Sequence, residues 1–184
     1  MMQWTVQAVA AFDLAGTNSA VGLVQLGVGL SMLILGPFGG VVADRVSKKP
    51  LVFWGEFAVA VSMAATGVLI LLGVLTILWL VLLTAVMGLV FAFLGPALQA
   101  WVGQMVPPRL LPNAVALTQL SMNMSRVGAP LLAAIMLSSA TIGAGGAYLF
   151  MGALFIVVLA TISRLPATRA KPKAQRRSVT TELV

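Results

Sequence analysis

The sequence predicts an all-α integral membrane protein, a bundle of five full transmembrane helices preceded by one partial helix. Of its 184 residues, 60% are hydrophobic and only 8% are charged, whereas soluble domains carry about 25% charged residues. The apolar residues also form long continuous runs, which indicate helices rather than the alternating strands of a membrane barrel. The solvent around this chain is therefore expected to be largely a lipid bilayer.

The lengths of the apolar runs give the number of crossings. A helix needs about 20 apolar residues to span a hydrocarbon layer of ~30 Å. Residues 51–98 contain a single charge, Glu56, and are too long for one crossing, so we expect a break near residues 73–76. We also expect a turn at the glycine-rich stretch 143–147. The predicted helices are 2–14 (partial), 20–43, 51–73, 75–98, 113–140 and 147–163, in one bundle over 1–163, followed by a basic tail, 164–184.

Basic residues mark one side of the predicted membrane protein. If the helices alternate in direction, all Lys and Arg residues except Arg126 fall on the same side. The positive-inside rule places that side in the cytoplasm. We therefore expect a multi-pass protein of the cell inner (plasma) membrane, with loops 44–50 and 107–112 and the C-terminal tail in the cytoplasm. The basic tracts lie between apolar runs and lack accompanying aromatic residues, so a nucleic-acid partner is not expected.

The chain lacks the residue types on which metal sites, disulfides and most enzyme active sites depend. Cysteine and histidine are absent, and there are only four carboxylates. Disulfides and the usual zinc sites are excluded, and neither a hydrolytic constellation nor a phosphate-binding loop is present. We therefore expect no enzyme, no metal and no cofactor.

Small residues repeat along two of the predicted helices. Because lipid gives little hydrophobic drive for helices to associate, small residues that allow close approach matter for packing. These stripes indicate either static packing within the bundle or a smooth surface on which helices slide. They consist of Gly22, Gly29 and Gly36 in the second predicted helix, and of Ser121, Ser125, Ala129 and Ala133 in the fifth, with Pro130 as a possible kink.

One basic residue is predicted to lie near the middle of the membrane. Arg126 follows Asn113 by thirteen residues, about 20 Å along a helix. An ionisable group at that depth is by default a functional hypothesis, and the alternative is a structural arginine paired inside the bundle. Asp13 is its plausible partner or a proton carrier, or else a solvated helix end. Gln119 and Asn123 are candidates for the same polar path, and Glu56 is expected to reach the surface or to pair with loop bases.

A dense group of charges separates two apolar runs. It reads Gly40-x-x-x-Asp44-Arg45-x-Ser47-Lys48-Lys49. A topology anchor explains the positive charges, because they hold the loop in the cytoplasm. It does not explain a carboxylate four residues after a glycine on the same helix face.

This pattern resembles the signature between helices two and three of the major facilitator superfamily, Gly-x-x-x-Asp-Arg-x-Gly-Arg-Arg. Ser47 stands for the second glycine, and Lys48 and Lys49 stand for the arginines. Three further segments resemble one exporter branch of that superfamily, which includes enterobactin and macrolide efflux proteins. They are residues 12–17, 95–117 and 123–130. The resemblance covers nearly the whole chain but only the N-terminal six-helix half of the family.

The resemblance implies a transporter of two halves that rock about a central site. In this family the loop carboxylate, here Asp44, contacts the other half, supported by Gly40 and Arg45, and Arg126 faces the central cavity. The implied function is export of a small amphipathic substrate, with a proton gradient as the energy source. The chain would then be truncated at both ends and would need a missing C-terminal half. The alternative is a half-size membrane protein that acts as a homodimer or an assembly subunit without transport of its own.

The chain departs from the drug and proton exchangers of that superfamily in two helices. Those proteins often carry an arginine four residues before a glycine in the fourth helix, where this chain has Thr84 before Gly88. Their fifth-helix signature of Gly-Pro followed by Gly-Gly is replaced here by Ala129–Pro130 and Ala133–Ala134.

Overall fold

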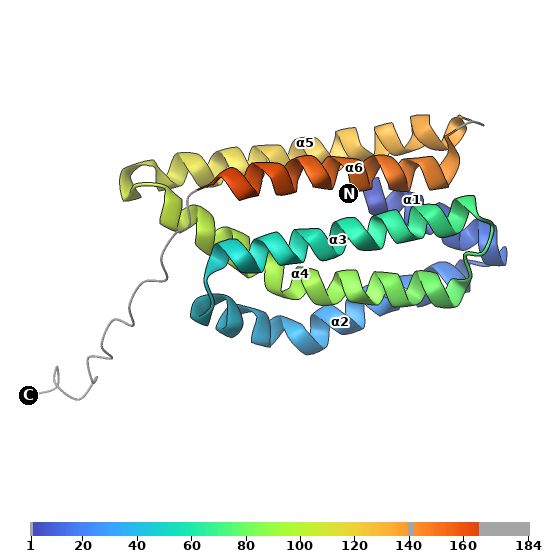
Figure 1. Ribbon diagram of the computed structural model, residues 1–184, viewed down its shortest axis with the longest axis horizontal. Coiled ribbons are helices and arrows are strands. Elements are labelled where there is room, and N and C mark those ends of the chain that lie inside the picture. Colours follow the sequence, from blue (N-terminus) through green and yellow to red (C-terminus); the bar gives the residue numbers. More distant parts are fainter. Residues whose placement is uncertain (1, 140–141, 166–184) are drawn as a thin grey trace, which may run out of the picture.

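The chain folds as a bundle of helices (Figure 1). The computed structural model describes residues 2–139 and 142–165, apart from the side chains of residues 41 and 43–45. The predicted tail beyond residue 165 lies outside the described residues. Within these ranges no strand occurs, and the elements are α1 (Met2–Ala15), α2 (Asn18–Arg45), α3 (Lys48–Leu71), α4 (Ile77–Met105), the 3-10 turn η1 (Pro108–Leu110), α5 (Leu111–Ser138) and α6 (Gly143–Arg164).

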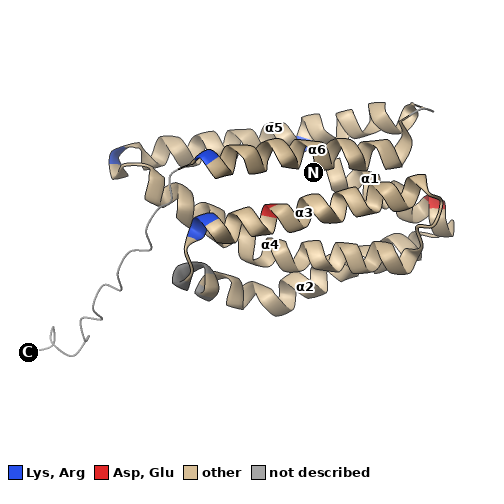
Figure 2. Cartoon of the chain, in the orientation of Figure 1, with Lys and Arg blue, Asp and Glu red and all other residues tan. Residues whose placement is uncertain are grey.

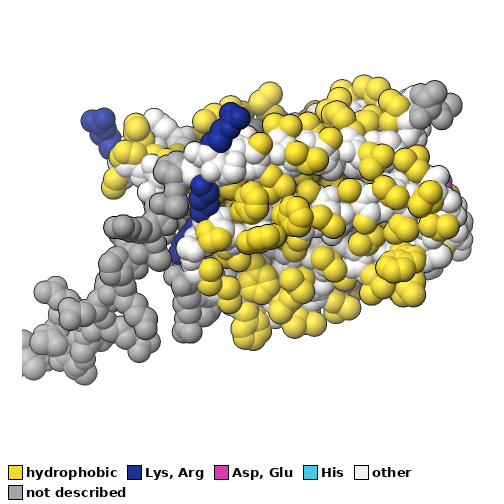
Figure 3. All heavy atoms as spheres, in the orientation of Figure 1, with side chains coloured by type: hydrophobic (Ala, Val, Ile, Leu, Met, Phe, Trp, Pro, Cys, Tyr) yellow, Lys and Arg dark blue, Asp and Glu magenta, His cyan; other side chains and the backbone are white. Residues whose placement is uncertain are grey.

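The all-α membrane fold predicted from the sequence is confirmed. Five helices, α2 to α6, are long and apolar enough to cross a bilayer. With 14 residues, α1 extends about 21 Å, less than the hydrocarbon thickness. Large apolar side chains cover the outer face of α2, α3, α4 and α6 (Figure 3). In water such a continuous apolar surface would cause association, whereas in a bilayer it contacts lipid chains.

Successive helices run in opposite directions, and short connections with defined causes join them (Figure 1). The turn after α3 uses Gly73 at φ 68°, a left-handed conformation that glycine adopts without steric cost. Thr76 then caps α4, because its hydroxyl accepts a hydrogen bond from the backbone N–H of Trp79 at 3.4 Å. After α4, Pro107 and Pro108, the first residue of η1, have no backbone N–H to continue a helix.

Helices α2 and α4 pack closely because glycines lie at their contact. A Cβ added to Gly39 would meet the carbonyl oxygen of Ala92 at 2.0 Å, and one added to Gly88 would meet Cα of Val28 at 2.8 Å. Glycine at these positions lets the two backbones approach directly, as in other membrane helix pairs. Gly27 adds a third such position on α2.

The stripe predicted to pack in α2 faces away from the rest of the described chain. An added Cβ at Gly22, Gly29 or Gly36 would meet no heavy atom within 4 Å, and all three residues are exposed. The stripe therefore does not pack within the described bundle. The α2 glycines that contact α4 are instead Gly27 and Gly39. The reason is geometric: a seven-residue repeat defines a helix face but not the neighbour that it meets.

Helix α6 begins earlier than the sequence predicted. The glycine-rich stretch 143–147, expected to be a turn, forms the first turn of α6. Gly67 of α3 lies against this turn, since a Cβ there would be 3.0 Å from the carbonyl oxygen of Gly145. A Cβ on Gly145 would in turn meet the side chain of Leu71 at 2.9 Å. The glycines therefore bring α6 close to α3 instead of ending a helix.

Three buried apolar clusters hold the bundle together. The central cluster draws on α1, α3, α4, α5 and α6, and it includes Ala133, with Ala129 packed against it. A second cluster joins α3, α4 and α6 around Trp101. The third joins α1, α2 and the start of α4 around Leu80. Helix α4 contributes to all three clusters and contacts α1, α2 and α3, while the short α1 contacts α2, α4, α5 and α6.

The α2–α4 contact can be tested at Gly39. Replacing Gly39 with Ala places a methyl group against the Ala92 backbone, and overpacking of this kind lowers the free energy of unfolding by about 1–3 kcal/mol. Unfolding of the purified chain in mild detergent, followed by circular dichroism during titration with dodecyl sulfate, measures this change.

Gly36→Ala is the matched control, because Gly36 lies on the same helix and a Cβ there has open space. Its stability is expected to stay unchanged or to rise by up to about 1 kcal/mol. Equal destabilisation by both substitutions would contradict the assignment of the α2–α4 contact.

Candidate functional site

Apart from Arg126 in the middle of α5, the described basic side chains gather at one end of the bundle, where α3 begins and α6 ends (Figure 2). Arg109 lies in η1 between α4 and α5, and Arg164 ends α6. Lys48 and Lys49 begin α3. These residues belong to connections on the same side of the alternating helices, so the structure gives the bundle one basic end.

Lys48 and Lys49 of the charged loop contact the bundle itself. The Nζ of Lys49 donates hydrogen bonds to the backbone carbonyl oxygens of Ser163, at 2.9 Å, and of Leu165. These are carbonyls at the C-terminal end of α6, where a helix carries partial negative charge and its last carbonyls lack helical partners. Lys48 is buried, and its Nζ donates to the carbonyl oxygen of Val46 at 3.4 Å. Lys49 therefore ties the start of α3 to the end of α6.

The acidic part of the same motif lies in the last turn of α2. Gly40 is half-buried, and a Cβ there would meet no heavy atom within 4 Å. The backbone of Asp44 and Arg45 belongs to α2, which ends at Arg45. The side chains of Asp44 and Arg45 are not among those that the structure describes. The structure thus places Asp44 at the basic end of the bundle, four residues after Gly40 on one helix face.

Helix α5 has a polar face at membrane depth. Arg126 is fifteen residues after the start of α5 and twelve before its end, which is about 22 Å and 18 Å along the helix. Gln119 and Asn123, both exposed, precede it by seven and three residues and lie on its side of the helix. Arg126 also lines a groove of about 320 Å³ beside this face, together with Thr118, Ser121, Met122 and Ser125; Gln119 and Asn123 are not among its lining residues.

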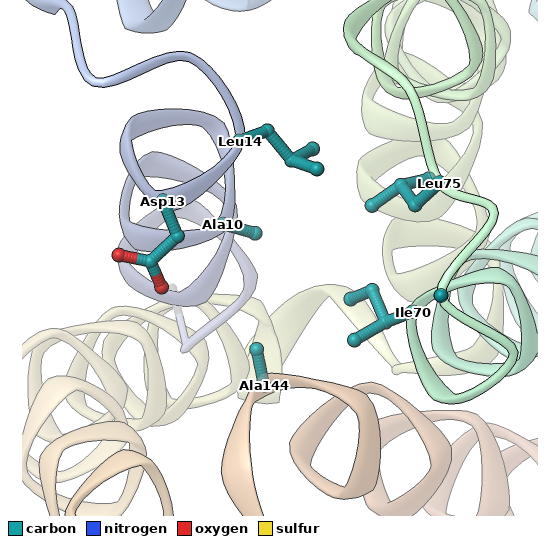
Figure 4. Close-up of a pocket in the computed structure, with 7 residues that line it drawn as sticks. Ala10, Asp13, Leu14, Ile70, Leu75 and Ala144 are labelled. Atoms are coloured by element: carbon teal, nitrogen blue, oxygen red, sulfur yellow. The ribbon is translucent and has the colours of Figure 1, made fainter.

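Asp13 lies in a different place from Arg126. It is exposed near the C-terminal end of α1 and lines a cavity of about 170 Å³ between α1, the α3–α4 turn and the start of α6. In Figure 4 its carboxylate turns away from the apolar side chains of Leu14, Ile70 and Leu75. The two residues line separate hollows, and no ion pair joins them among the described residues. The pairing of Asp13 with Arg126 considered from the sequence is therefore absent.

Glu56 is buried in α3 instead of reaching the surface. Only 8% of its surface is exposed, and the neighbouring Gly55 packs against Val90 and Leu94 of α4. The sequence suggested that this carboxylate reaches the membrane surface or pairs with loop bases. Glu56 is buried because it shares the face of α3 that packs against other helices of the bundle. Val52 and Val59, one turn away on either side, are buried on the same face.

Two buried glutamines of α1 were missed by the sequence reasoning. The Nε2 of Gln7 donates to Oγ1 of Thr84 at 2.8 Å, and the Nε2 of Gln3 donates to Sδ of Met87 at 2.8 Å. Both side chains are buried against α4. Their four-residue spacing on a short apolar helix was a signal of one polar stripe. Thr84, where exchangers often carry an arginine, thus anchors α1 to α4.

Comparison with known proteins agrees with this architecture. The family model described as transmembrane secretion effector, a major facilitator family, matches residues 2–184. The chain is also 28% identical to the protein named "Probable metabolite transport protein CsbC" of Bacillus subtilis (strain 168), over 87% of this chain. The match spans 36% of that protein, so this chain covers well under half of its length. The chain therefore belongs to the transmembrane secretion effector family of the major facilitator superfamily.

Proposed function

We propose that this bundle is the N-terminal half of a secondary active transporter that exports small amphipathic compounds by alternating access. The polar face of α5 is the observation that carries the proposal. An arginine near the middle of a membrane-spanning helix is costly in lipid, and such residues line substrate or ion pathways. In transporters built from two related halves, the substrate site lies near the bilayer midplane between the halves. Arg126, together with Gln119 and Asn123, is proposed to line this pathway.

The least buried helices support a partner bundle. Helices α2 and α5 have much lower buried shares than the other membrane-spanning helices. On α2 the uncovered face carries Gly22, Gly29 and Gly36 among exposed large apolar side chains, and Gly22 and Gly29 line a hollow together with Leu23 and Leu26. A surface of this kind suits a second helical bundle, because the glycines let a partner helix approach α2 closely.

The loop after α2 is proposed to be the gate between the two halves. Lys49 is held by the end of α6, so this loop moves with its own bundle. Asp44 precedes it at the end of α2 and is proposed to contact the partner half in one conformation, with Gly40 and Arg45 in support. Lys48 belongs to the same motif as a loop anchor. Breaking the Asp44 contact then shifts the balance between the inward-facing and outward-facing states.

The basic end of the bundle is proposed to face the cytoplasm, in the inner (plasma) membrane. The positive-inside rule supports this orientation, because Lys and Arg are enriched in cytoplasmic loops. The proton gradient across that membrane is the proposed energy source, and Asp13, at the opposite end of the bundle, is a proposed carboxylate on the proton path.

Export is tested by dye accumulation in bacteria that lack their major exporters. Cells expressing the gene product that contains these residues are expected to accumulate less of an amphipathic fluorescent dye than vector controls. A protonophore is expected to abolish the difference. The 184-residue chain expressed alone should leave accumulation unchanged, since the site and gate need a second bundle. Efflux by that chain alone would refute the need for a second bundle, and a gene product inactive towards every dye would count against export.

The gate is tested by Asp44→Asn in the same gene product. A hydrogen bond to a charged group contributes about 1.5–3 kcal/mol, so its loss is expected to reduce the export rate about tenfold or more. Glu182→Gln is the matched control, because it removes a carboxylate from the C-terminal tail. Full activity of the Asn variant at equal expression would exclude a gating role for Asp44.

The orientation is tested with single cysteines, which is simple because the chain has none of its own. Ser47→Cys lies at the basic end and Gly16→Cys at the opposite end. In intact cells, a membrane-impermeant maleimide is expected to label the cysteine at position 16 and to label the one at position 47 only after lysis. The reverse pattern would show that the basic end faces outward.

A further inference from the structure

Helix α5 divides into two faces along its first five turns. One face exposes large apolar side chains at intervals of three and four residues, namely Leu117, Leu120, Met124, Val127 and Leu131, each more than half exposed. This spacing forms one stripe suited to lipid. The residues that line the groove lie on the opposite side. Further along, this side becomes the contact with the bundle, where Ala133 is fully buried. The groove is therefore on the inward side of α5 and not on its lipid side.

The groove offers one strong donor. The hydroxyl of Thr118 donates to the carbonyl oxygen of Ala114 at 2.8 Å, and that of Ser121 donates to the carbonyl oxygen of Leu117 at 2.9 Å. Because these hydroxyls already donate to backbone carbonyls of α5, they serve a ligand only as hydrogen-bond acceptors. The Arg126 guanidinium carries five N–H donors and a permanent positive charge. A ligand that matches this groove presents an acceptor to Arg126 and is preferably anionic.

The positive charge of Arg126 is not neutralised within the described part of the chain. Asp13 lines another cavity, and Glu56 is buried in α3. No ion pair with Arg126 occurs among the described residues. An unneutralised cation at this depth attracts an anion more strongly than one in water, because the low local dielectric weakens the field less.

We propose that the groove of α5 binds the anionic group of a small amphipathic molecule, with Arg126 as its counter-charge and Met122 against its apolar body. This inference rests on the proposed transport function and specifies the substrate class. A carboxylate, sulfonate or phosphate fits the guanidinium, which accepts planar or tetrahedral oxyanions through paired hydrogen bonds. Met122 adds a flexible, polarisable side chain that adapts to different apolar groups.

Two other occupants fit the groove less well. A second copy of the chain that docked through the same face would bring two Arg126 residues into one interface that supplies no carboxylate from this face. A lipid headgroup phosphate lies at the edge of the hydrocarbon layer, about 15 Å from its middle. Arg126, about 20 Å from either end of α5, is nearer the middle than the edge.

The experiment compares two fluorescent probes that differ in one charged group. They are 8-anilinonaphthalene-1-sulfonate and N-phenyl-1-naphthylamine, which lacks the sulfonate. The chain is placed in nanodiscs of phosphatidylcholine, and binding to empty nanodiscs is subtracted. The chain is expected to bind the sulfonate about tenfold more tightly than the neutral probe, as a charge-assisted hydrogen bond allows.

Arg126→Gln is expected to abolish this preference while leaving binding of the neutral probe unchanged, and Arg126→Lys to retain part of it. Arg164→Gln is the matched control, since Arg164 is an exposed arginine at the basic end of the bundle. Unchanged binding of the neutral probe, together with circular dichroism, shows that the variants fold.

An unchanged preference for the sulfonate in Arg126→Gln would overturn the proposal. So would a loss of preference in Arg164→Gln as large as that in Arg126→Gln, because surface charge alone would then explain the binding. A preference that disappears when phosphatidylglycerol replaces part of the lipid assigns the groove to headgroups and also overturns it. Equilibrium binding needs no second bundle and no gradient. If export is not observed but the chain still prefers the sulfonate probe, the transport proposal fails and the anion site stands. If export is observed without that preference, only the anion site fails.

Discussion

The direct backbone contact between Gly39 and Ala92 fixes how closely α2 approaches α4, which joins this pair to the rest of the bundle through α1 and α3. Lipid chains are as apolar as leucine, so helices in a membrane associate mainly through close van der Waals contact. Glycine allows that contact at Gly39 and Gly88, and again where Gly67 of α3 meets the first turn of α6. Two close-packed pairs result, α2 with α4 and α3 with α6, and α4 also packs against α3.

The sequence predicts the helices of this fold well but not their contacts. Hydropathy and length identify five crossings and a short α1, because each depends on the chain's own composition. The contact surfaces depend on which helix lies opposite, and composition carries no such information. The sequence thus left the stripe through Gly29 open between packing within the bundle and a sliding surface, whereas Gly27 and Gly39 make the contact with α4. The glycines of 143–147 were read as a turn for a related reason, since glycine serves both turns and close approach.

The same distinction explains which site residues the sequence could identify. Arg126 stands out because a charge in an apolar run is costly wherever the helix packs. Gln3 and Gln7 do not stand out, because an amide becomes significant only once its partner is known, and Thr84 and Met87 lie about eighty positions away in the chain. Lys49 was recognised as part of a charged motif, yet its contact with the end of α6 required the folded arrangement of α3 and α6.

Rocking of one bundle against another requires strong contacts within each bundle and weak, smooth ones between them. Inside this bundle, backbones approach directly at Gly39, Gly88 and Gly67, so the paired helices cannot slide past each other without backbone clashes. On the uncovered face of α2, exposed glycines alternate with exposed large apolar side chains such as Leu26 and Leu33. Lys49 joins the charged loop to α6, so that the loop and the bundle move together. One set of glycines thus sets the close spacing inside the bundle, and the other lies on the uncovered face of α2, where the proposed partner half would pack.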